Sequence, residues 1–118
     1  MERTKFEELV TFAVKNLPEK FRFQLKNVEI VVETEAPAHI LRQQGIKSPF
    51  QLLGLYQGVP LKSRTHRYAN VLPDKISIYQ RPIETICRHP GELMQKIQEV
   101  VTHEIGHHFG LSEAELRI

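Results

Sequence analysis

The sequence predicts a single domain, residues 1–118, that combines helices with strands. Apolar side chains recur at the helical spacing of three and four residues near both ends of the chain, in residues 6–17 and 92–105. Between these segments, residues 27–33 and 74–80 alternate in the way that is typical of strands. A length of 118 residues suits one domain with one modest core.

Thr4 is expected to be the N-cap of the first helix, because Thr4 and Glu7 have the spacing of a capping box. Pro18 is expected to end it. We interpret its apolar stripe as core packing: Phe6, Leu9, Val10, Ala13, Val14 and Leu17.

The middle of the chain predicts shorter elements. Residues 39–44 suit a short helix closed by Gly45, and residues 50–59 suit a strand or part of a hairpin. Residues 61–70 are polar and basic, which favours a solvated loop over one that contacts substrate. In residues 74–80, Ile76 and Ile78 share one face and Ser77 and Tyr79 the other. Pro73 and Pro82 bracket this strand, which suits a sheet edge, because proline cannot donate to a ladder.

The C-terminal helix follows a short helix or turn at residues 83–88. Pro90 suits the first helical position. The apolar face comprises Leu93, Met94, Ile97, Val100, Val101 and Ile105. His103 and His107 fall at the flank of this face, so we expect them at the border between core and solvent.

Composition and charge narrow the function. A net charge of +2 is too small to suggest a nucleic-acid partner, and no apolar run is long enough to span a membrane. Residues 1–5 do not resemble a signal peptide, so we expect a cytoplasmic protein. Cys87 is the single cysteine, which excludes an intrachain disulfide and a thiolate zinc cluster, and we interpret it as a small buried apolar residue.

The chemistry is concentrated in the segment H-E-I-G-H-H-F-G-L-S-E, residues 103–113. His103 and His107 are four residues apart, so on a helix they lie one turn apart on one face and can bind one metal ion. A third ligand cannot come from the same straight helix. Gly110 can end the helix in the left-handed conformation, after which Glu113 can turn back to the metal. Glu115 is the alternative third ligand if that turn is longer.

This ligand set predicts a catalytic zinc site with the fourth position left to water. Glu104 follows His103 directly and is the expected general base, which takes a proton from the water as it attacks a carbonyl and passes it to the leaving amine. His108 lies about 140° from His103 around the helix, so we expect it to be a surface residue or a neighbour of the ligands. Tyr56, Tyr68 and Tyr79 are each candidates to stabilise an oxyanion.

The segment resembles the extended zinc signature H-E-x-x-H-x-x-G-x-x-H/D of metzincin-type metallopeptidases, with Glu113 at the third position. No methionine follows it to form their Met-turn. More closely, the chain resembles the small bacterial zincin-like metallopeptidase family with a minimal zincin fold. Besides the zinc motif, this resemblance includes L-G-L-Y-Q-G-V-P at residues 53–60, L-P-D-K-I-S-I-Y at 72–79 and R-P-I at 81–83.

The resemblance implies an α+β fold in which an N-terminal helix and the active-site helix pack against a small mixed sheet. It also implies that residues 74–80 lie near the cleft edge and pair with an extended peptide. The expected function is zinc-dependent hydrolysis of peptides or exposed protein segments. The first alternative is a non-catalytic metal-binding or protein-interaction module on the same scaffold. The second is another metal-dependent hydrolase, such as a nuclease-like enzyme.

Overall fold

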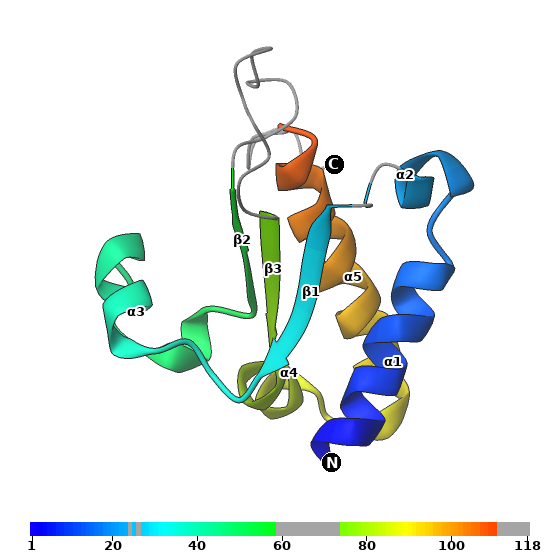
Figure 1. The fold of residues 1–118 in the computed structure, drawn as a ribbon. Helices are drawn as coiled ribbons and strands as arrows, with labels where there is room; N and C mark the ends of the chain where they lie inside the picture. Colours follow the sequence, from blue (N-terminus) through cyan, green and yellow to red (C-terminus); the bar gives the residue numbers. More distant parts are fainter. Residues whose placement is uncertain (24, 26, 59–73, 111–118) are drawn as a thin grey trace, which may run out of the picture.

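The structure is a computed structural model that describes all residues except 24, 26, 59–73 and 111–118 (Figure 1). The elements in chain order are α1 (Arg3–Lys15), α2 (Glu19–Phe23), β1 (Val28–Glu33), α3 (Ala38–Gln44), a 3-10 turn (Pro49–Gln51), β2 (Gly54–Gln57), β3 (Asp74–Tyr79), α4 (Gln80–Ile86) and α5 (Pro90–His108). These elements form the expected α+β fold, with helices packed on a small mixed sheet.

The sheet has the strand order β1-β3-β2. Strand β3 is parallel to β1, with Val28 opposite Asp74, and antiparallel to β2, with Gly54 opposite Ile78. The prediction that residues 74–80 form an edge strand is therefore wrong. Pro82 lies in α4, beyond the strand, and β3 itself contains no proline, so its backbone can form hydrogen bonds on both sides.

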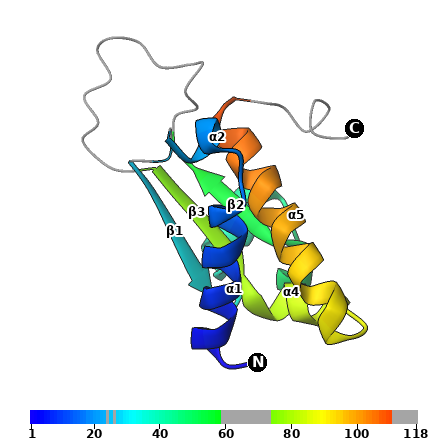
Figure 2. The ribbon, with the colours of Figure 1, turned by 90° about the vertical axis from the view of Figure 1, so that its right-hand side faces the viewer.

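The two faces of the sheet are covered differently. Helices α1 and α5 pack together on one face, and α3 lies toward the opposite side (Figures 1 and 2). Ile76 and Ile78 are fully buried in the main core beneath α1 and α5. Tyr79 belongs to a second, smaller cluster with Ile40 and Leu41 of α3. The predicted alternation of this strand is confirmed, although both of its faces are buried.

The N-cap of helix α1 is Glu2, two residues earlier than the capping box predicted. The backbone N–H of Phe6 donates to the carbonyl of Glu2 at 3.1 Å, so the helical ladder already includes Thr4. Glu2 is the N-cap, and its side chain makes no capping hydrogen bond. The predicted core stripe is confirmed in its centre, where Phe6, Val10 and Ala13 are buried.

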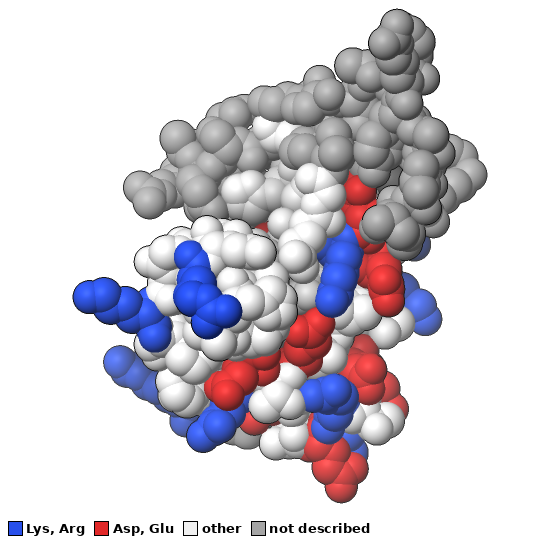
Figure 3. All heavy atoms as spheres, turned by 60° about the vertical axis from the view of Figure 1, so that its left-hand side comes forward, with Lys and Arg blue, Asp and Glu red and all other residues white. Residues whose placement is uncertain are grey.

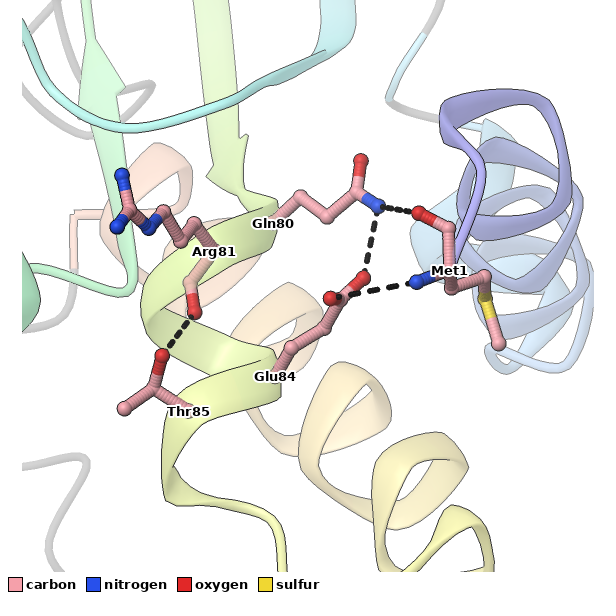
Figure 4. Close-up of polar contacts among 5 residues, drawn as sticks. All are labelled: Met1, Gln80, Arg81, Glu84 and Thr85. Atoms are coloured by element: carbon pink, nitrogen blue, oxygen red, sulfur yellow. Dashed lines mark hydrogen bonds and ion pairs between the residues drawn. The ribbon is translucent and has the colours of Figure 1, made fainter.

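Side chains of α4 hold the start of the chain against the sheet (Figure 4). The amide nitrogen of Gln80 donates to the carbonyl of Met1 and to Glu84 Oε1, both at 2.7 Å. The terminal amine of Met1 lies 3.5 Å from Glu84 Oε2. These contacts fix the N-terminal end of α1 relative to α4, which directly follows the central strand.

The surface around α3 carries both basic and acidic side chains, so neither charge dominates the described part of that face (Figure 3). None of the helices in the described ranges is long and apolar enough to cross a bilayer.

Helix α5 spans 19 residues and begins at Pro90, as predicted. Its buried apolar residues are Leu93, Ile97, Val100, Val101 and Ile105. His103 and His107 are half-buried, which confirms that they lie at the border of the core. The helix contacts α1, β2 and β3, so its polar C-terminal turns are fixed relative to the sheet.

Candidate metal centre

His103, Glu104 and His107 come together on the last two turns of α5. The Nε2 atoms of the two histidines are 3.3 Å apart, and their ring centroids are 4.9 Å apart. One ligand atom from each of the three residues lies within 4.8 Å of the others. The three residues that the sequence assigned to metal binding and proton transfer on this helix are therefore adjacent in space.

The separation of the two imidazoles fits a zinc ion. With zinc–nitrogen bonds of about 2.0–2.1 Å and tetrahedral geometry, two nitrogen ligands lie about 3.3–3.4 Å apart. The observed 3.3 Å matches this value and is longer than most hydrogen bonds donated by nitrogen. The donor set of imidazole nitrogen and carboxylate oxygen is also one that zinc accepts.

Glu104 is 7% exposed and lies against the backbone of β2. A Cβ atom at Gly54 would lie 3.2 Å from Glu104 Cγ and 2.8 Å from Val100 Cγ1. Only a glycine allows the strand to approach the helix so closely. No role was expected for Gly54 from the sequence, although a glycine within a strand is itself a signal of close backbone approach.

The predicted end of the helix is confirmed at Gly110. Its φ angle of +90° lies in the left-handed region that favours glycine, and its N–H donates to the carbonyl of His107 at 2.9 Å. The helix therefore ends within three residues of the second histidine. Both candidates for the third ligand, Glu113 and Glu115, lie outside the described residues, so this ligand stays a prediction.

His108 was expected to be either a surface residue or a neighbour of the ligands, and the surface alternative is wrong. It is 1% exposed, and its Nδ1 atom lies 3.1 Å from Oδ2 of Asp74, which is 2% exposed. The hydroxyl of Tyr56 donates to the same Oδ2 atom at 2.7 Å. His108 follows Ile97 by eleven residues, which is about three turns, so helical periodicity alone places it on the buried face.

The other titratable candidates are less suited to chemistry. Burial raises the pKa of the Tyr79 phenol, and the carboxylates of Glu33 and Glu104 raise it further. Cys87 packs against the main core but is half-buried, so the prediction that it is buried is only partly right. Its partial burial, together with the nearby carboxylate of Glu92, raises the pKa of the thiol. Cys87 therefore remains protonated at neutral pH, as its interpretation as an apolar residue requires.

Together, the fold and this geometry define a class: a small α+β domain whose sheet supports a helix that carries the motif H-E-x-x-H, with residues that could hold a metal ion. The sequence model of the family described as zincin-like metallopeptidase matches residues 25–118. The chain belongs to this family. The matched region includes the whole sheet and α5 but excludes α1. A comparison with curated proteins finds no match to the chain.

Proposed function

We propose that the protein is a zinc-dependent peptidase that hydrolyses peptide bonds in peptides or exposed protein segments. In this proposal His103, His107 and Glu113 hold the zinc ion, and Glu104 is the general base. The observation that carries it is the 3.3 Å separation of the histidine Nε2 atoms, with the Glu104 carboxylate beside them.

The protein side chains divide the work. A bound zinc ion supplies Lewis-acid chemistry, which polarises a carbonyl group and lowers the pKa of water to about 7. Glu104 accepts a proton from the attacking water on a carboxylate oxygen and donates it to the leaving amine. Its position against β2 keeps the carboxylate in one orientation, because the strand backbone occupies the space behind Cγ.

The sheet topology changes the expectation for how a peptide is held. Strand β3 is paired on both sides, so it has no free edge for an added strand. Strand β2 is paired with β3 on one side and contacts α5, and within the described part of the chain no strand pairs with its other side. We propose that an extended substrate pairs with β2, which brings its backbone next to Glu104.

Metal analysis of the purified protein, followed by digestion of a peptide library with and without a chelator, tests the proposal. We expect one zinc ion per chain and cleavage that the chelator abolishes. Glu104→Gln should retain zinc and lose about 10²–10⁴-fold in rate, because proton transfer is removed while the ligands remain. A fully active Glu104→Gln variant contradicts the mechanism. Bound zinc without turnover on any peptide supports the non-catalytic module instead.

A further inference from the structure

The C-terminal turn of α5 is attached to the sheet by buried polar groups in addition to the apolar Ile105. We call these three residues the His108 cluster: Tyr56 of β2, Asp74 of β3 and His108 of α5. It joins three separate elements at the turn of the helix that carries His107. The rest of the buried face of α5 is apolar, apart from Glu104.

The geometry of the cluster is directional. Asp74 Oδ2 accepts the Tyr56 hydroxyl at 2.7 Å and lies 3.1 Å from His108 Nδ1. An ionised carboxylate can only accept, so the Nδ1–H tautomer of the imidazole is the one that can donate a hydrogen bond to it. Hydrogen bonds weaken steeply when they are bent, whereas apolar contacts tolerate rotation. The cluster therefore restrains the rotation of α5 about its axis more tightly than the apolar face can.

Burying the polar groups of this cluster costs free energy that apolar side chains would not. Asp74 and His108 are almost fully removed from water, and His108 Nε2 is buried with no hydrogen-bond partner among the residues that the structure describes. Burying such groups is unfavourable, and apolar residues of similar volume are often at least as stable. A buried polar group that adds little stability is better explained by the orientation that it imposes.

The residue that follows strand β2 is a glycine, Gly58, which leaves room for the side chains of the cluster. A Cβ atom at Gly58 would lie 2.5 Å from Asp74 Oδ1 and 2.9 Å from the Tyr56 hydroxyl oxygen. Any side chain at this position would displace the carboxylate. The glycine is thus a second, independent sign that the position of the Asp74 carboxylate matters.

Rotation of the helix bears directly on the metal site. A histidine Nε2 atom lies roughly 6 Å from the helix axis, so a rotation of about 10° moves it by about 1 Å. Metal–ligand distances tolerate only about 0.2 Å. A rotation keeps His103 and His107 aligned with each other, but it moves both relative to β2, which lies against α5 at Gly54.

We propose that Tyr56, Asp74 and His108 are positioning residues of the metal site, which fix the rotation of α5 and thereby the direction in which His103 and His107 face. This inference rests on the proposed zinc site. In this proposal the cluster does not contact the metal. His108 acts through the backbone of α5, which also carries His107.

The test uses the full chain, freed of metal and titrated with zinc in competition with a chromophoric chelator. The absorption spectrum of the cobalt(II) form reports the ligand geometry. His108→Leu removes the hydrogen bond, whereas His108→Asn places an amide N–H near the position of Nδ1–H. Tyr56→Phe removes a single oxygen and serves as a second variant if His108→Leu does not fold. Ile97→Val, in the apolar part of the same helix, is the control for lost stability.

We expect His108→Leu and Tyr56→Phe to bind zinc about tenfold more weakly and to alter the cobalt spectrum. His108→Asn should restore most of the affinity, and Ile97→Val should lower the melting temperature without changing affinity or spectrum. Parent-like zinc affinity and cobalt spectrum in both His108→Leu and Tyr56→Phe overturn the inference but leave the proposed function intact. A parent chain that binds no zinc overturns both.

Discussion

The two parts of α5 are buried in different ways. In residues 90–101 the side chains that face the sheet are apolar, and Ile97 and Val101 are almost completely inaccessible. In residues 103–108 the buried set includes Glu104 and His108, while His103 and His107 are only half-buried. The first part supplies stability through burial of apolar area. The second gives up some of that stability to orient polar groups.

The opposing strand shows the same division. Strand β2 and the residue that follows it contain two glycines. Gly54 lies where the two parts of the helix meet, against Val100 and Glu104, and Gly58 lies against Asp74. The close approach of the backbone at these two positions replaces side-chain packing with a fixed distance. Substitutions in the two parts of α5 should therefore separate stability from metal binding.

The largest contrast is expected between Ile97→Ala and His107→Ala. Ile97→Ala leaves a cavity in the main core and should lower the free energy of unfolding by about 2–5 kcal/mol. His107→Ala removes a proposed ligand at the border of the core and should abolish tight zinc binding at a much smaller cost in stability. Urea denaturation of the metal-free proteins and zinc titration of the folded proteins measure the two effects.

The zinc affinity of Ile97→Ala can contradict this expectation. If Ile97→Ala, measured where it is fully folded, binds zinc as weakly as His107→Ala, the two parts of α5 are not separable. The metal site would then depend on the whole core and not on the last turns of the helix.

A second prediction concerns the wall behind the proposed base. In Gly54→Ala the new Cβ would lie 2.8 Å from Val100 Cγ1 and 3.2 Å from the carbonyl oxygen of Ser77. We expect a loss of about 1–3 kcal/mol in the free energy of unfolding, and a lower kcat with little change in KM, because Glu104 must shift.

Gly45→Ala is the matched control for this variant. Gly45 has φ +69° at the end of α3, and a Cβ there would meet nothing within 4 Å. Its substitution should cost about 1–2 kcal/mol through backbone strain alone. Equal losses of kcat in the two variants would show that turnover follows stability and not the position of Glu104.

A smaller effect is expected at Gly58, where the contact is a side chain that can move. Gly58→Ala should displace the Asp74 carboxylate and cost about 1–2 kcal/mol in the free energy of unfolding. Gly91→Ala, on the exposed first turn of α5, should change the same quantity by less than about 0.5 kcal/mol. Thermal unfolding of the metal-free proteins compares them, and equal melting temperatures would show that the cluster tolerates the extra carbon.

The sequence predicts the parts of this molecule that depend on local pattern. The start of α5 at Pro90, the helix break at Gly110 and the closure of α3 by Gly45 each follow from the backbone preference of one residue. The adjacency of His103 and His107 follows from helical spacing. Membership of the zincin-like family was also recognisable from residues 103–113, together with the segments around β2 and β3.

The long-range features could not be predicted in the same way. The prolines near residues 74–80 suggested an edge strand, but the position of β3 at the centre depends on which segments pair across the sheet. The contacts of His108 with Asp74 and Tyr56 cross 34 and 52 positions of the chain, so no local pattern indicates them. The burial of His108 could be predicted from the helical periodicity of α5, whereas its hydrogen-bond partners could not.

The smallest effect is expected at alkaline pH and involves the face of the sheet away from α5. Burial raises the pKa of Tyr79 above its ordinary value of 10.0, and the nearby carboxylates of Glu33 and Glu104 add to this. The neutral phenol therefore stabilises the folded chain below about pH 10, and this contribution falls as the pH rises, because the unfolded chain ionises first. Near that pH the slope for one such group is at most about 1.4 kcal/mol per pH unit. In Tyr79→Phe the free energy of unfolding should fall less steeply between about pH 9.5 and 11 than in the parent chain. Parallel stability curves for the two proteins over this range would show that Tyr79 ionises equally easily in both states, and that its burial against α3 does not restrict it.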